Sequence, residues 1–183
     1  MKKIPILTLV LLFMFSCNVF AADSKSTNSD ITSYSVKEHL IFDALNTTYY
    51  FEPYSEENHI AQLKDGQFSW QECDVNCSLK KIESLTPAIG AIMLNGVKRN
   101  VVAWGALYWG GGTGIFTEIM IAVEQPDGTI MSRQPISIGD RIYCRKISIS
   151  RNKIVIDYLD HRQNQAMAEA PTIPKKYTVT LND

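Results

Sequence analysis

The chain has 183 residues, of which 45% are hydrophobic and 20% are charged, as is typical of a globular protein with a substantial core. Its 18 basic and 19 acidic side chains give a formal net charge of −1. Because no basic excess is available to neutralise phosphates, the composition argues against nucleic acid as a partner.

Residues 1–21 have the order of features of a secretory signal peptide. Lys2 and Lys3 precede an apolar run from Ile4 to Phe15, and a small-residue exit follows at residues 19–21. The run is well short of the ~20 residues that a helix needs to span a bilayer, so cleavage is favoured over a permanent anchor. Removing two lysines and no acid moves the formal charge from −1 to −3. We therefore predict a periplasmic or secreted protein without a transmembrane segment after cleavage.

Cys17 leaves a second fate of the N-terminus open. It stands at the end of the apolar run, where a lipoprotein signal places the cysteine that receives lipid, and Ser16 suits such a site. Met14 and Phe15 do not fit the usual pattern of that signal. Cleavage after Ala21, which discards Cys17, is therefore favoured over a lipid anchor.

The next segment is predicted to be a flexible leader followed by one short helix. Residues 22–34 are small and polar and have no apolar periodicity. Ser35 and Glu38 then have the spacing of a capping box, and apolar residues at helical spacing follow as far as Asn46. We expect residues 35–183 to form a single domain that is β-rich beyond this helix.

Beyond residue 47 the apolar pattern becomes strand-like, and turn signals recur roughly every eight to twelve residues. Asp65-Gly66 and Asn95-Gly96 favour tight hairpin turns because both residues tolerate positive φ, and residues 125–128 and 150–153 are further corners. The predicted fold is mainly β: an antiparallel meander that forms a sandwich or a partly open barrel. The expected strands are Ala88–Leu94, Val101–Trp109, Ile115–Val123, Ile142–Ser150, Ile154–Leu159 and Tyr177–Leu181.

Two of these strands carry further information. Residues 101–109 are apolar at both odd-numbered and even-numbered positions, which predicts a central strand that is covered on both faces. In residues 142–149 the apolar residues change from even-numbered to odd-numbered positions, so we expect a bulge near Arg145 and Lys146. Cys144 in the same strand is predicted to be a small buried hydrophobe rather than a reactive thiol.

Cys73 and Cys77 lie close together in a turn-like segment. An oxidising compartment favours a disulfide between them. A zinc site would need further ligands, but His39, His59 and His161 do not stand at ligand spacing to this pair. A redox site would need two intervening residues and a following helix, and neither is present. We predict a Cys73–Cys77 disulfide and no metal site.

The segment from Tyr108 to Phe116 contains four glycines between aromatic residues. It lacks the Lys and Ser or Thr of a phosphate-binding loop and the strand-to-helix context of a dinucleotide fingerprint. One interpretation is an exposed loop with adhesive aromatic residues. The commoner arrangement is a hairpin whose aromatic side chains pack across the strands. The candidate binding residues are Tyr108, Trp109, Gly111, Gly112, Thr113 and Phe116.

The densest titratable cluster consists of Asp157, Asp160, His161 and Arg162. The two acids fall on opposite faces of an extended strand, so they are not expected to converge as paired catalytic carboxylates. No Gly-x-Ser-x-Gly elbow accompanies the histidine. A solvated strand end is the default interpretation, and we predict no catalytic residue and no cofactor.

Residues 110–116, 138–142 and 147–158 combine glycine turns with short apolar strands. In these pieces the chain from about residue 87 onward resembles an uncharacterised group of small exported bacterial proteins. The resemblance implies export and β structure, and it brings no activity. Several relatives look as if they carry an acidic Asp-x-Asn-x-Asp-Gly segment where this chain has residues 93–100. Those acids are missing here, so a calcium role is not carried over.

These observations favour a non-enzymatic interaction module of the bacterial envelope, whose partner is an envelope protein or a cell-wall component. Two alternatives stay open. One is an envelope hydrolase that uses Asp157, Asp160 or His161 in an unfamiliar arrangement, and the other is an envelope protein anchored by lipid at Cys17.

Overall fold

The computed structural model describes residues 28–51, 59–72 and 75–181, so the predicted signal peptide and Cys17 lie outside the described residues. The described part begins with helix α1 (Asn28–Leu45) and continues as strands. The strands are β1 (Thr48–Phe51), β2 (His59–Gln62), β3 (Gln67–Glu72), β4 (Val75–Lys81), β5 (Ala88–Leu94), β6 (Val97–Trp109), β7 (Phe116–Glu124), β8 (Ile130–Asp140), β9 (Tyr143–Ser150), β10 (Lys153–Asp160) and β11 (Ile173–Thr180).

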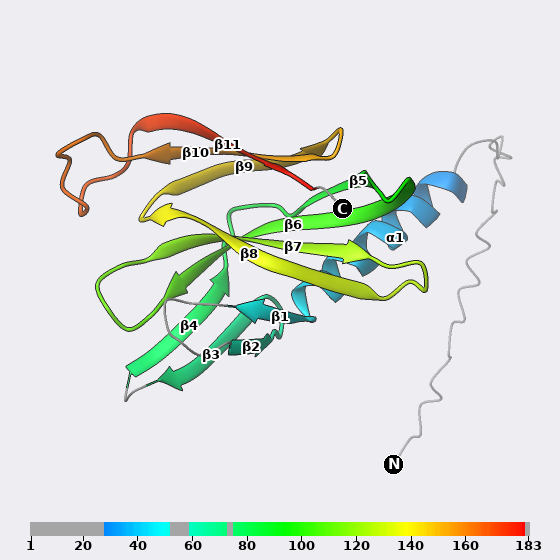
Figure 1. The fold of residues 1–183 in the computed structure, drawn as a ribbon, viewed down its shortest axis with the longest axis horizontal. Coiled ribbons are helices and arrows are strands. Elements are labelled where there is room, and N and C mark those ends of the chain that lie inside the picture. The colour runs from blue at the N-terminus through cyan, green and yellow to red at the C-terminus, as the bar shows by residue number, and fades with distance from the viewer. Residues whose placement is uncertain (1–27, 52–58, 73–74, 182–183) are drawn as a thin grey trace, which may run out of the picture.

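The strands form three antiparallel sheets that do not close, which confirms the predicted mainly β fold (Figure 1). The largest sheet has the order β3-β4-β6-β7-β8. β5 pairs with the first part of β6, and β4 pairs with its last part, so the two share one edge of that long strand. A second sheet has the order β11-β10-β9, and β1 pairs with β2 in a third.

Strand β6 separates two hydrophobic cores. Val101 and Ala103 face the outer core, which fills the space between the largest sheet and the β9–β11 sheet. Val102 and Trp104 face the inner core, which α1, β1 and β2 help to enclose. All four side chains are buried, so the prediction of a central strand covered on both faces is confirmed. The inner core consists of Leu40, Ala44, Tyr49, Ala61, Leu63, Leu79, Val102, Trp104, Ala106, Tyr108, Met120 and Ala122.

Helix α1 ends one residue before the predicted end at Asn46 but begins earlier than predicted. Residues 28–34, which we expected to be part of a flexible leader, are helical, so Ser35 lies inside the helix and does not cap it. Asn28, Ser29 and Asp30 are residue types that favour a helix start, the last because its charge complements the helix dipole. The helix therefore begins at this upstream signal and not at the predicted capping box.

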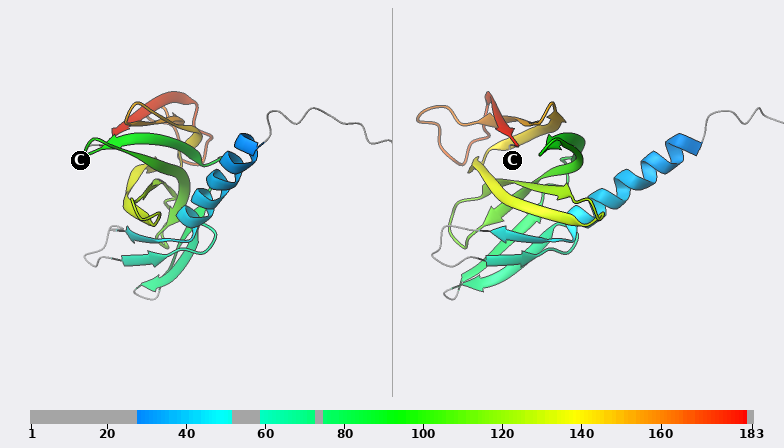
Figure 2. Two further views of the ribbon diagram at one scale, coloured as in Figure 1. Left: turned by 90° about the vertical axis from the view of Figure 1, so that its right-hand side faces the viewer. Right: turned by 45° about the vertical axis from the view of Figure 1, so that its right-hand side comes forward.

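The C-terminal part of α1 packs against the sheets (Figure 2). Leu40 and Ala44 are buried in the inner core, whereas Val36 and Phe42 are exposed. Among the described residues, no helix combines the length and the hydropathy of a membrane span.

The predicted corners are confirmed. Both central residues have positive φ in three of these turns, and in the fourth Gly128 N donates to Gln125 O at 3.0 Å. The three turns are Asp65-Gly66, Asn95-Gly96 and Arg151-Asn152.

The predicted bulge in β9 is also confirmed. Asp157 of β10 faces Lys146, whereas the next residue, Tyr158, faces Cys144, so Arg145 is the extra residue. The bulge lets Cys144 and Ile147 both point into the outer core although they differ in parity.

Strand β8 was not among the expected strands, and Pro135 within it is a residue type that argues against a strand interior. Proline is tolerated here since β8 is the edge of its sheet and its pairing is irregular at this point. The register passes from Ile119↔Ile136 to Ile121↔Arg133, which leaves Pro135 in a bulge.

Candidate functional site

The glycine-rich loop between β6 and β7 rests on a pair of packed aromatic rings. Tyr108 and Phe116 are cross-strand partners, and their ring centroids lie 6.4 Å apart. Tyr108 is only 4% exposed and belongs to the inner core. The hairpin therefore has the arrangement in which aromatic side chains pack across the strands, and Tyr108 supports the loop from beneath rather than lying on its surface.

Two glycines allow the loop backbone to lie directly on these rings. A Cβ atom at Gly110 would come within 2.7 Å of the Tyr108 hydroxyl, and one at Gly114 within 2.7 Å of the Phe116 ring. Any larger residue would have to displace either the loop or these rings. Gly112, in contrast, faces open space, so its backbone is presented to solvent.

Trp109 is the aromatic residue that the loop exposes. Its side chain lies on the strand face opposite to Tyr108, it is 38% exposed, and its Nε1 donates a hydrogen bond to Gly112 O at 2.6 Å. Leu107 and Ile115 are exposed nearby in the sequence on the same hairpin. We call this area the loop surface: Leu107, Trp109, Gly111, Gly112, Thr113 and Ile115.

The end of β8 holds the far side of the loop. Asp140 Oδ1 accepts a hydrogen bond from Ile115 N at 2.8 Å, and Arg141 N donates to Ile115 O at 2.7 Å. The Asp140 carboxylate also lies 3.4 Å from Arg141 Nη1. These bonds come from a strand that follows the loop by more than twenty residues, so local sequence carries no signal for them.

Glu118 is a buried acid on the inner-core side of β7. It is 4% exposed, and its carboxyl hydrogen-bonds Ser137 of β8. Burial raises the pKa of this carboxyl, and the Ser137 hydrogen bond offsets part of the rise. The sequence signal for this buried carboxyl is a lone acid within the apolar stretch of residues 115–123.

Replacing Glu118 with glutamine is expected to change how stability depends on pH. Because the folded-state pKa lies above the ordinary value of 4.5, this carboxyl stabilises the fold fully only below that value. Its contribution is lost as pH rises through the folded-state pKa. Urea denaturation should therefore show Glu118→Gln gaining stability over the wild type as pH rises above 4.5. Glu169→Gln, at an exposed position, is the control. Parallel pH profiles for wild type and Glu118→Gln would contradict this account.

Asp157 and Asp160 bind separate lysines of β11. Asp157 Oδ1 lies 3.3 Å from Lys176 Nζ, and Asp160 Oδ2 accepts a hydrogen bond from Lys175 Nζ at 2.7 Å. The hydrogen bond from Lys175 lowers the pKa of Asp160, which keeps this carboxylate ionised. Each acid thus has the environment of a strand-edge ion pair.

His161 is oriented by backbone rather than by a carboxylate. Its Nε2 lies 3.2 Å from Arg141 O, so the ring carries its proton on Nε2 and donates it to that carbonyl. Asp160 Oδ1 accepts a hydrogen bond from the backbone N–H of His161 at 2.7 Å and not from the ring. The buried Nδ1 has no hydrogen-bond partner among the residues that the structure describes. An acid that orients the imidazole, as a catalytic dyad requires, is not provided by Asp160.

The cysteines take different positions. Cys77 is buried on β4, but Cys73 lies outside the described residues, so the Cys73–Cys77 disulfide stays a prediction. Cys144 is buried in the outer core, and burial raises the pKa of its thiol to about 11, which confirms the prediction of an unreactive hydrophobe. Within the described ranges, no group of three or more His, Cys, Asp and Glu side chains is placed to hold a metal ion.

No family model, curated protein or solved structure gives a significant match to this chain. The resemblance of its C-terminal half to exported bacterial proteins stays a prediction. Function must be argued from the geometry of the loop surface and of the strands around it.

Proposed function

We propose that this chain is an exported, non-enzymatic binding module of the bacterial envelope, and that it contacts its partner through the loop surface. The features of residues 1–21 support export to the periplasm or beyond. The near-neutral net charge favours an envelope protein or a cell-wall component over nucleic acid as the partner.

One observation carries the proposal: Trp109 is exposed, yet its indole is fixed by the hydrogen bond to Gly112 O. Tryptophan is enriched among the residues that dominate binding energy at protein interfaces. A side chain that is already held in place loses little conformational entropy on binding. The buried Tyr108 ring and the partly buried Phe116 ring beneath the loop add to this rigidity.

The proposal predicts that Trp109→Ala abolishes capture of the partner from an envelope extract, with mass spectrometry identifying what the wild type retains. Thermal unfolding should shift by only a few degrees, because Trp109 is 38% exposed and belongs to neither hydrophobic core. Tyr143→Ala removes another exposed aromatic residue, from β9, and should leave capture unchanged.

Two outcomes would overturn the proposal. If Trp109→Ala loses folding and capture in parallel, the residue has a structural role. If it captures the partner as well as the wild type does, the loop surface is not the contact site. Intact-mass analysis of the mature N-terminus separates cleavage after Ala21 from a lipid anchor at Cys17.

A further inference from the structure

Strands β2 and β3 leave a gap between them although a tight turn joins them. Next to the Asp65-Gly66 turn, Lys64 and Gln67 form a bridge in which each backbone N–H donates to the other's carbonyl at 3.0 Å. Beyond that bridge the strands separate. Among the described residues, β2 pairs with β1 alone and β3 with β4 alone.

The backbone groups that border the gap can be assigned from the alternation of antiparallel pairing. Leu63 N donates to Thr47 O, so Ile60 and Gln62 of β2 direct their N–H and C=O groups away from β1. Ile60 and Gln62 alternate along the strand with the same phase as Lys64, whose backbone groups form hydrogen bonds toward β3.

The same reasoning applies to the other side of the gap. Lys81 N donates to Gly66 O, so Ser69 and Gln71 of β3 direct their backbone groups away from β4. They share the parity of Gln67, which bonds toward β2. Two unpaired strand edges therefore border the same gap.

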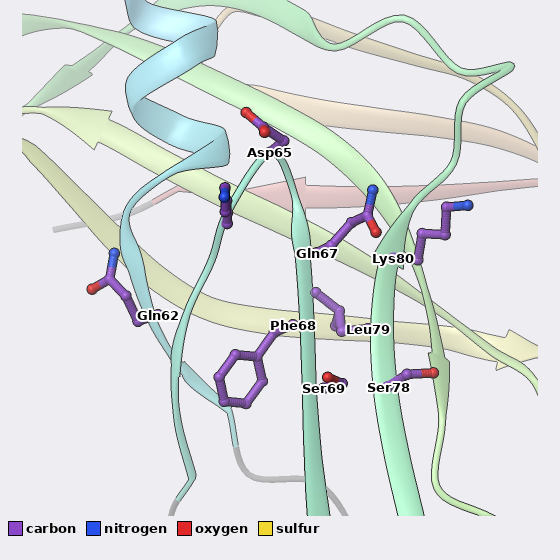
Figure 3. A pocket seen from close by; sticks show the side chains of 9 residues that line it. Gln62, Asp65, Gln67, Phe68, Ser69, Ser78, Leu79 and Lys80 are labelled. Atoms are coloured by element: carbon purple, nitrogen blue, oxygen red, sulfur yellow. The ribbon is translucent and has the colours of Figure 1, made fainter.

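The gap is hollowed and has two chemically different sides. A pocket of about 600 Å³ lies here, and Figure 3 shows the Phe68 side chain reaching from β3 toward β2. Leu79 belongs to the inner core and the partly buried Phe68 packs against it, so the two supply an apolar floor. Lys64 and Lys80 are exposed at the rim and form no ion pair within the described part of the chain.

Hydrogen bonds tie both sides of the gap to the last residue of α1 and to the residue after it. Gly66 N donates to Leu45 O at 2.8 Å, and Asp65 N donates to Asn46 Oδ1 at 3.1 Å. Gln62 Nε2 donates to Asn46 O at 3.0 Å. The turn and β2 are thus both attached to the segment that joins α1 to β1.

We propose that this gap receives an extended peptide segment of a partner protein, added as a strand between β2 and β3. A peptide in β conformation offers N–H and C=O groups on both sides, which is what the two edges require. Its alternate side chains would be apolar toward Phe68 and Leu79 and acidic toward Lys64 and Lys80, because the rim is basic. The site shares no residue with the loop surface, so it goes beyond the function proposed above.

The test is selection of a displayed library of random nonapeptides against the mature chain, followed by titration of the enriched peptides. We expect sequences that alternate apolar and acidic residues. N-methylation of alternate amides in such a peptide should weaken binding at least about tenfold, since it removes the hydrogen bonds to one edge. The protein is unchanged in that experiment, so a folding defect cannot explain the loss.

Protein variants separate this site from the others. Ser69→Pro, which removes a backbone donor at the edge, and the double change Lys64→Glu with Lys80→Glu should each weaken peptide binding, while Trp109→Ala should not. Absence of enriched peptides, or binding that survives N-methylation and charge reversal, would overturn the proposal. So would a dimer of the isolated chain that Ser69→Pro dissociates, because a second copy would then occupy the gap.

Discussion

Replacing Trp104 with alanine is expected to lower the free energy of unfolding by about 3–5 kcal/mol, the cost of removing a large aromatic side chain from a packed core. Trp104 is fully buried at the centre of the inner core. Its ring meets Tyr49 edge-on, with centroids 6.1 Å apart, and its Nε1 donates to the Tyr49 hydroxyl at 3.2 Å. That hydroxyl donates in turn to Ala44 O at 3.1 Å. The indole therefore links β6 to β1 and to the end of α1.

Urea denaturation followed by circular dichroism measures this loss. Trp109→Ala is the matched control, because it removes the same side chain from an exposed position five residues along the same strand. If the two variants lose equal stability, the inner core is not built around Trp104. Burial also raises the pKa of Tyr49 well above its usual range, so its hydroxyl stays protonated throughout such experiments.

Replacing Gly90 with alanine is expected to destabilise the outer core by about 1–3 kcal/mol, as overpacking of a close contact does. A Cβ atom at this position of β5 would lie 2.6 Å from both Cβ and Cγ2 of Ile149 on β9. The two sheets lie so close together at this point that an added methyl group would force them apart. Denaturation of Gly90→Ala in urea gives the magnitude.

A double-mutant cycle shows whether the effect comes from this contact. Ile149→Gly removes both Cβ and Cγ2, so the combined variant should lose less stability than the sum of the single variants. Strict additivity would mean that the cost of Gly90→Ala arises elsewhere in β5.

Sequence alone predicted those parts of the fold whose signals are local. Dipeptides such as Asn95-Gly96 fix a hairpin corner by themselves, and the parity switch after Cys144 locates the bulge at Arg145. Strand β8 was missed because Pro135 argues against a strand unless its edge position is known, and that position follows from the topology. The early start of α1 was missed because a polar segment resembles a leader as much as a first helical turn.

The site was predicted only in part, for the same reason. The sequence places Trp109 and the glycines in one loop, but it does not distinguish Tyr108, which the inner core covers, from its exposed neighbour. The Asp140 bond to the loop and the gap between β2 and β3 both depend on pairing between distant segments. Periodicity within a strand carries no information on either.

Hydrogen–deuterium exchange of the mature chain, with and without the partner that it captures, tests the central claim most directly. If the chain works as a binding module through the loop surface, the partner should slow exchange most strongly in residues 107–116. Protection confined to residues 157–162, with the loop unchanged, would contradict the account and return the Asp157, Asp160 and His161 cluster to the centre of the function.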